Sequence, residues 1–209
     1  MANSEGKKKR AGRRAYLNDF KVGSDGQYSY RGLVHRCTAP LPYNKVKLRI
    51  GIYAGVMAAA AAACGFVPAD SMLGFGNWYV VPFFVLELIC VFLTVWSSVR
   101  MLLNGSELRD YVFKAAPARL PLRALAAFIA SIISGVSNAV YLMINGFGKN
   151  PAAMAALLAL HGAVCVSAIL LRTLILSLKW EEIKVDTDQA AFSAAYELEN
   201  EAGQAEQNE

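Results

Sequence analysis

Hydrophobic and polar positions along this chain separate into blocks. Four apolar runs with few charges occupy 46–67, 78–99, 121–147 and 151–178, and the charged residues gather in the connections and at both ends. A water-soluble core helix would show polar positions about every turn, which these runs lack. About 20 helical residues, rising about 1.5 Å each, cross a hydrocarbon core about 30 Å thick. The pattern therefore predicts an all-α integral membrane protein with four transmembrane helices in an antiparallel bundle.

The same pattern divides the chain into three parts. We expect a basic N-terminal region at 1–45, in which 1–14 is disordered and 16–45 is partly ordered. The four-span membrane domain covers 46–180. An acidic, largely disordered tail fills 181–209.

Two short segments outside the spans have patterns of their own. Phe20-Lys-Val and Gln27-Tyr-Ser-Tyr30 flank a glycine-bearing turn, which predicts a small hairpin. Between spans 2 and 3, apolar residues recur at helical spacing over Ser106–Ala116, with charged residues on the opposite side. This arrangement predicts a short interfacial helix at the cytoplasmic membrane surface.

The distribution of charge predicts how the chain is oriented. Residues 1–49 carry twelve Lys or Arg against three acidic residues, and residues 180–209 carry one Lys against nine acidic residues. The loop between spans 1 and 2 has no Lys or Arg, whereas the segment from Arg100 to Arg123, which comprises the loop between spans 2 and 3 and the start of span 3, has five. Because short cytoplasmic loops are enriched in Lys and Arg, both termini and the central loop are predicted to be cytoplasmic. The expected location is the cell membrane, with an uncleaved first span.

Near the N-terminus, six basic residues fall within eight positions: Lys7, Lys8, Lys9, Arg10, Arg13 and Arg14. Such a block can adhere to the anionic lipids of the inner leaflet, at about 1 kcal/mol per basic residue near the surface. A simpler role in setting topology is the alternative. No nucleic acid is expected as a partner, because no aromatic platform or recognised module accompanies the block.

Small residues recur every four positions in two of the spans. They are Gly51, Gly55, Ala59 and Ala63 in span 1, and include Ser131 and Gly135 in span 3. Helices that lack side-chain bulk approach closely and gain van der Waals contact, which drives association in lipid. These residues are therefore predicted to be helix-packing positions.

Three polar residues within the spans share a similar depth. Glu87 lies nine residues inward from the start of span 2, and His161 lies nine residues inward from Ala152 in span 4, so both are about 13.5 Å deep. Asn138 lies about seven residues below the outer end of span 3. Ionisable groups in lipid are costly and often functional. The three are predicted to form an intramembrane cluster, either as a structural contact between helices or as a proton-sensitive or cation-binding position.

Motifs for enzymatic chemistry are absent from the sequence. It contains no phosphate-binding loop, dinucleotide-binding glycine pattern, zinc-protease motif or serine-hydrolase elbow. The four cysteines form no C-x-x-C pair, so neither a zinc site nor a structural disulfide is expected. No catalytic residue, metal or cofactor is predicted.

From these observations we rank three hypotheses for the function of the protein. The leading hypothesis is a non-enzymatic membrane subunit or accessory protein that binds another membrane protein or a second copy of itself. The alternative is a small oligomeric transporter or channel that uses the Glu87, Asn138 and His161 cluster. A membrane-embedded enzyme ranks third.

Overall fold

The computed structural model of this protein describes residues 20–22, 28–30, 32–38, 42–68, 78–146 and 150–184. The chain forms two compact units. The first combines residues 1–36, 107–111 and 181–209; the second, here called the four-helix unit, combines 37–106 and 112–180. The basic block at 7–14, the turn of the predicted hairpin and most of the acidic tail lie outside the described residues.

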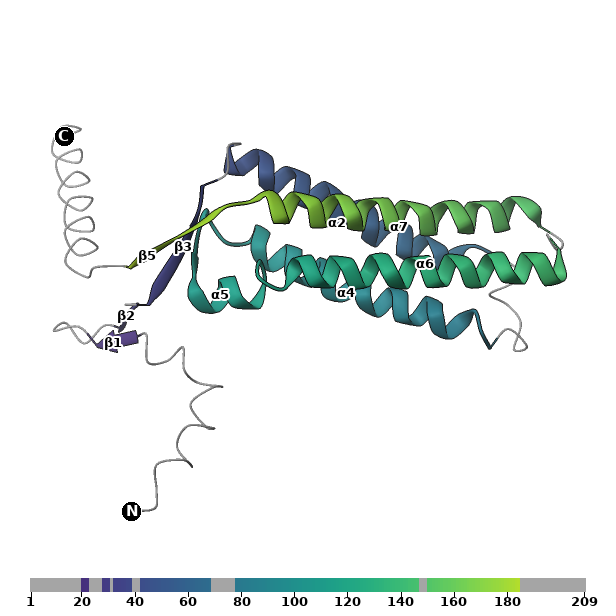
Figure 1. The fold of residues 1–209 in the computed structure, drawn as a ribbon, viewed down its shortest axis with the longest axis horizontal. Coiled ribbons are helices and arrows are strands. Elements are labelled where there is room, and N and C mark those ends of the chain that lie inside the picture. Colours follow the sequence, from purple (N-terminus) through teal and green to yellow (C-terminus); the bar gives the residue numbers. More distant parts are fainter. Residues whose placement is uncertain are drawn as a thin grey trace, which may run out of the picture. The chain divides into compact units, whose positions relative to one another are not determined.

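The four-helix unit is built from α2 (Tyr43–Phe66), α4 (Val81–Leu102), α6 (Leu120–Asn145) and α7 (Pro151–Ser177). Each of these helices is long and apolar enough to cross a membrane (Figure 1). The protein is therefore mostly helical, with four candidate membrane spans, as the hydrophobic pattern predicts. The bounds differ from the apolar runs by a few residues; α4, for example, begins three residues late because Trp78–Val80 form a turn.

The helix ends follow local sequence rules. The side-chain oxygen of Asn150 accepts a hydrogen bond from the backbone N–H of Ala153 at 3.1 Å, and Pro151 occupies the first helical position. Pro82 and Pro121 also lie in first turns, where a missing N–H costs no intrahelical hydrogen bond. At the other end of α6, Gly146 has a φ of 72°, a conformation that favours glycine.

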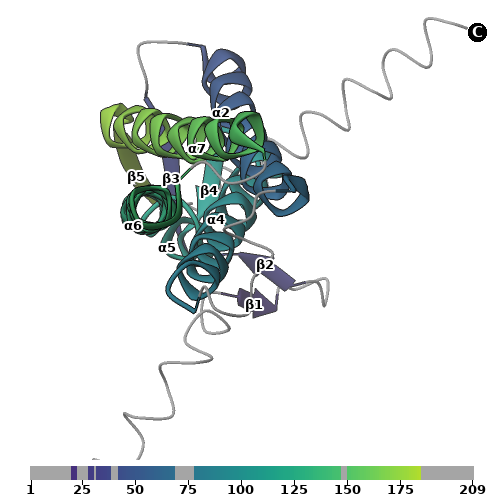
Figure 2. The same cartoon turned by 90° about the vertical axis from the view of Figure 1, so that its right-hand side faces the viewer.

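The four helices are neighbours in the cyclic order α2, α4, α6, α7. Extensive contacts join α2 to α4, α4 to α6, α6 to α7 and α7 back to α2 (Figure 2). The helices α4 and α7 are therefore not neighbours but face each other across the interior. Any side chain that joins α4 to α7 has to pass through the centre of the unit.

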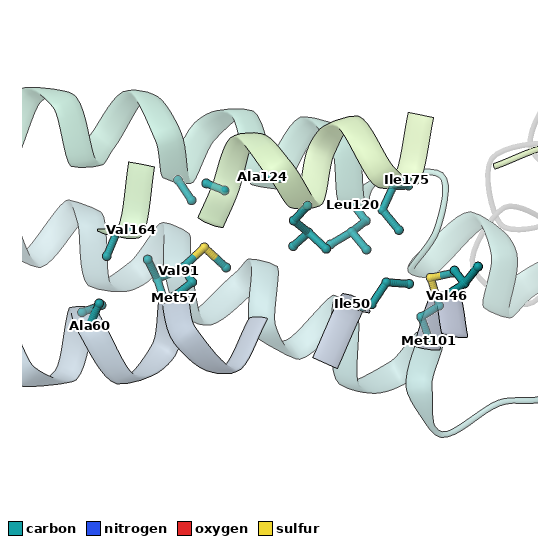
Figure 3. Close-up of a cluster of buried hydrophobic side chains, with 14 of the residues drawn as sticks. Val46, Ile50, Met57, Ala60, Val91, Met101, Leu120, Ala124, Val164 and Ile175 are labelled. Atoms are coloured by element: carbon teal, nitrogen blue, oxygen red, sulfur yellow. The ribbon is translucent and has the colours of Figure 1, made fainter. Parts of the chain in front are cut away.

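Two hydrophobic clusters fill the interior of the four-helix unit. The larger cluster, here called the Leu120 half, includes residues such as Val46, Ile50, Met101, Leu120 and Ile175 (Figure 3). The smaller cluster, here called the Phe84 half, consists of Cys64, Phe84, Met154 and Leu157, with partly buried residues around them. Each cluster draws residues from at least three of the four helices.

The first unit contains short strands that modify the all-α prediction. β1 (Phe20–Val22) and β2 (Tyr28–Tyr30) pair antiparallel, with Phe20 opposite Tyr30, which confirms the predicted hairpin. A second sheet has the order β4–β3–β5, with β3 (Leu33–Cys37) between β4 (Glu107–Arg109) and β5 (Trp180–Lys184). No strand was predicted for these three segments.

The connection between α4 and α6 is correspondingly different from the prediction. A helix was expected over Ser106–Ala116, but only α5 (Asp110–Ala115) is helical, because Glu107–Arg109 pair with β3 instead. This pairing places Leu108 opposite His35, and both side chains are buried. Strand pairing thus overrides a helical periodicity that spans only three turns.

Polar contacts support the three-stranded sheet. His35 Nε2 lies 3.0 Å from Asp110 Oδ1, and Arg36 donates to Glu107 Oε1 from two guanidinium nitrogens, at 2.8 Å and 2.5 Å. The Tyr30 hydroxyl donates to the carbonyl oxygen of Leu33 and accepts from the backbone N–H of Asp110. Apart from the Tyr30–Leu33 hydrogen bond, these contacts join residues 71 to 80 positions apart in the sequence.

Candidate functional site

The candidate site is a group of buried polar side chains in the Phe84 half of the four-helix unit. Glu87 belongs to the inward stripe of α4, between the buried residues Phe84 and Val91. His161 lies four residues after Leu157 on the inward stripe of α7. Spacings of three and four residues place successive side chains on one helix face, so each polar residue points where its apolar neighbours point.

Glu87 and His161 meet across the centre of the unit. Glu87 Oε2 lies 2.8 Å from His161 Nδ1, and the two residues are 0% and 2% exposed. The separation is an ion-pair distance, but the oxygen lies off the direction in which the ring hydrogen would point, so no aligned hydrogen bond forms. Because α4 and α7 are not neighbours, this contact closes the interior along its diagonal.

The third predicted member of the cluster, Asn138, touches the other side of the imidazole ring. Its Nδ2 lies 3.3 Å from His161 Nε2 and also donates to the backbone carbonyl of Ser134 at 3.0 Å. Glu87, His161 and Asn138 therefore form one chain of contacts from α4 through α7 to α6. The structure brings together the three residues that the sequence places at a similar depth.

Close approach of α6 and α7 holds this arrangement in place. Ser131 Oγ donates to the backbone carbonyl of His161 at 2.9 Å. At Gly135, an added Cβ would lie 3.6 Å from His161 Cβ, an ordinary van der Waals contact. The ring of Phe84 meets the imidazole edge-on, with 6.4 Å between the ring centroids. Apolar and backbone groups thus restrict the orientation of the imidazole ring.

Several polar atoms at the site have no hydrogen-bond partner among the described residues. They are both carboxyl oxygens of Glu87, Nδ1 of His161 and the hydroxyl oxygen of Ser134. A buried polar atom without a partner costs about 1–3 kcal/mol, so such groups in a folded protein usually serve some purpose. No group of three or more His, Cys, Asp or Glu residues in the described part of the chain could hold a metal ion. A carboxyl group beside an imidazole can hold or exchange a proton.

The predicted packing residues occupy two different surroundings. Ser131 and Gly135 lie at the contact between α6 and α7, as described above. The span 1 residues lie mostly outside the interior: Gly55 and Ala59 are exposed, and Gly51 and Ala63 are half-buried. At Gly55, an added Cβ would meet no atom within 4 Å. Among the described residues, no other helix therefore covers Gly55 and Ala59, whereas a Cβ added at Gly51 would lie 3.9 Å from Leu102 Cδ1 of α4.

Sequence reasoning missed a second group of buried polar residues, in the Leu120 half. Thr94, Ser97 and Ser98 are fully buried and donate to backbone carbonyls one turn earlier in α4. The Arg123 side chain of α6 also contacts the Ser97 hydroxyl oxygen. The signal was present as three hydroxyl residues within five positions of an apolar run. Hydroxyl groups bonded to their own helix are common, however, and do not by themselves indicate a site.

Comparison with known proteins gives no further guide to the role of these residues. No family model, curated protein or solved structure matches the chain.

Proposed function

We propose that this protein is a multi-pass protein of the cell membrane that acts as a non-enzymatic subunit or accessory protein, bound to another transmembrane helix. The observation that carries this proposal is the exposed small-residue stripe on α2.

The distribution of basic residues supports insertion with both termini in the cytoplasm. Among the described residues of the four-helix unit, Lys and Arg gather at one set of helix ends. They lie near the start of α2 and the start of α6, near the end of α4 and the end of α7, and in the segments that adjoin these ends. The remaining described parts of the four helices, 55–66, 81–95, 130–145 and 151–168, contain none. A strongly basic end, opposite an end whose connections contain Lys149 as their single Lys or Arg, fits the positive-inside rule. The basic block at 7–14 would then lie beside anionic lipids of the inner leaflet.

Core packing supports an antiparallel bundle. The Leu120 half combines Val46 and Ile50 from the start of α2, Met101 from the end of α4, Leu120 from the start of α6 and Ile175 from the end of α7. Starts and ends of successive helices therefore share one cluster. Each connection then crosses only one end of the bundle.

The surface proposed for binding, here called the α2 face, consists of Ile52, Gly55, Val56 and Ala59. All four are exposed, and their spacing places them on one side of the helix. Gly55 and Ala59 carry little side-chain bulk, which allows a second helix backbone to approach closely. Ile52 and Val56 are β-branched and have few side-chain rotamers to lose on packing. Such a surface favours a helix as its partner.

The outer surfaces of α4 and α6 are different in kind. They expose large side chains, among them Phe92, Trp96, Ile129 and Val136. Bulky apolar side chains keep a neighbouring helix at a distance and are well solvated by acyl chains. Lipid is therefore the expected neighbour of α4 and α6, and a protein helix the expected neighbour of α2.

Photo-crosslinking in native membranes tests this proposal. A photoreactive amino acid at Ile52 should give a covalent adduct of defined mass, and one at Val136 on α6 should give none. Gly55→Leu, which adds side-chain bulk to the α2 face, should reduce the Ile52 adduct at least tenfold. Ala126→Leu enlarges a small exposed residue on α6 and serves as the matched control, which should leave the adduct unchanged.

The mass of the adduct identifies the kind of partner. An adduct that adds another 22.6 kDa indicates a second copy of this chain, and any other single mass indicates a different subunit. Both results support the proposal. The absence of an adduct at Ile52, or an adduct that Gly55→Leu leaves unchanged, would overturn it.

The Glu87–His161 contact favours a second candidate function, a small oligomeric transporter or channel. An ionisable pair that is fully buried among apolar helices is often part of an ion or proton pathway. Purified protein in liposomes should then carry a proton or cation flux that Glu87→Gln abolishes. Flux that is absent, or that persists in Glu87→Gln, would rule out this candidate.

A further inference from the structure

The orientation of the Asn138 amide follows from a backbone group. The carbonyl oxygen of Ser134 can only accept a hydrogen bond, and it lies 3.0 Å from Asn138 Nδ2. The reversed amide would place two acceptor oxygens against each other. The Asn138 NH2 group is therefore held toward Ser134, and the same nitrogen lies 3.3 Å from His161 Nε2.

This orientation selects one tautomer of His161. An NH2 group has only donors, so Nε2 must present its lone pair to Asn138. A neutral imidazole with an unprotonated Nε2 has its hydrogen on Nδ1, the nitrogen that lies 2.8 Å from Glu87 Oε2. A doubly protonated ring would bring an N–H group against the Asn138 NH2 group, so Asn138 disfavours the imidazolium cation.

We propose that Glu87 is a proton-binding carboxyl group, and that Asn138 makes it so by holding His161 as a neutral ring with its hydrogen on Nδ1. A charged carboxylate would then leave one uncompensated negative charge in the apolar interior, which is strongly unfavourable. Glu87 instead takes up one proton from water: an O–H bond forms on the carboxylate, His161 keeps its own hydrogen, and the cluster becomes neutral.

The other titratable groups facing Glu87 do not supply a compensating positive charge. Thiols come from three sides: Cys64 of α2, Cys90 of α4 itself and Cys165 of α7, each close enough to interact electrostatically with Glu87. From α6, Tyr141 packs partly buried against the Phe84 half. Thiols and phenols are neutral or negative, so among these described neighbours only His161 can become a cation, and Asn138 disfavours that state.

The inference stands apart from the proposed subunit role, and it deepens the transporter candidate without requiring it. A carboxyl group that binds one proton is what a proton pathway needs at its centre. In a protein that transports nothing, the same carboxyl group would make the contact between α4 and α7 depend on proton binding.

Nitrogen NMR of histidine tests the tautomer directly. The sequence has two histidines, so His35→Gln leaves His161 as the only residue that ¹⁵N-histidine labels. In the full chain in lipid nanodiscs at neutral pH, Nδ1 should show the shift of a protonated nitrogen and Nε2 that of an unprotonated one. Asn138→Asp, which offers an acceptor to Nε2, should move the hydrogen to Nε2. Ser137→Ala, one residue away and bonded to the Tyr79 carbonyl, should change nothing.

Infrared spectroscopy tests the proton on Glu87. The wild-type protein should show a protonated carboxyl stretching band that shifts in D2O and disappears in Glu87→Gln. An imidazolium at His161, or the absence of this band, would mean a plain salt bridge and would overturn the proposal. A tautomer and band as expected, in a protein without liposome flux, would keep the proton site and remove the transporter candidate.

Discussion

The two halves of the four-helix unit bury polar groups in different ways. In the Leu120 half, the hydroxyl groups of Thr94, Ser97 and Ser98 donate to carbonyls of their own helix, and large apolar side chains fill most of the space between helices. One polar contact crosses between helices there, from Arg123 of α6 to the Ser97 hydroxyl, and the Arg172 Nε atom is buried without a partner among the described residues. In the Phe84 half, Glu87 and His161 reach between helices and keep atoms without hydrogen-bond partners. Packing of apolar side chains stabilises most of the Leu120 half, whereas the contact between Glu87 and His161 in the Phe84 half depends on which of their atoms carry protons.

This difference between the halves indicates that the Phe84 half is the place to test for a function. A hydroxyl group that donates to a carbonyl of its own helix has its hydrogen satisfied without a neighbouring helix, as for Thr94 and Ser98. A carboxyl group that contacts an imidazole across the diagonal constrains both helices and responds to protonation. Under the proposal that Glu87 binds a proton, the Phe84 half is the region whose contacts depend on pH.

The largest effect is expected from a cavity in the Leu120 half. Leu120→Ala removes a side chain that is 0% exposed and should lower the free energy of unfolding by about 2–3 kcal/mol. This is the lower part of the range for water-soluble proteins, because lipid solvates the exposed side chain in a way that water does not. Reversible unfolding in mixed micelles measures it. Leu122→Ala, at a residue 70% exposed on the same helix, is the control and should change stability by less than about 0.5 kcal/mol.

An intermediate effect is expected from removing one partner in the Phe84 half. His161→Leu leaves a neutral Glu87 carboxyl group without its polar neighbour, and the loss should be about 1–2 kcal/mol in the same unfolding assay. Glu87→Gln keeps the shape and a hydrogen-bonding group, so it should stay within about 1 kcal/mol of wild type. A loss of about 3–5 kcal/mol in His161→Leu would indicate a broken ion pair and contradict the neutral cluster.

The smallest effect is expected from a hydroxyl group in the Leu120 half. Ser98→Ala removes a hydrogen bond to the Thr94 carbonyl at 3.0 Å within one helix. Polar contacts in membrane helices are worth about 0.6 kcal/mol on average, and the change should not exceed that value. If Ser98→Ala proves as costly as His161→Leu, the distinction between the two halves does not hold.

The sequence alone was sufficient for several features of the fold, each of which depends on nearby residues. The apolar runs predicted four long helices because span length follows directly from residue count. Phe20-Lys-Val with Gln27-Tyr-Ser-Tyr30 predicted the pairing of β1 with β2. The capped start of α7 likewise depends on neighbouring residues, Asn150 and Pro151. The similar depth of Glu87 and His161 indicated that contact was geometrically allowed.

Other features were decided by the tertiary structure. The strands β3, β4 and β5 are three to five residues long and come from distant parts of the chain. No local sequence pattern therefore predicts that they pair. The rotation of each helix about its axis is set by packing, and it turned Glu87 toward His161 while leaving Gly55 exposed. Span length and helix caps are local properties, whereas rotation and strand pairing depend on contacts between residues that the sequence does not place side by side.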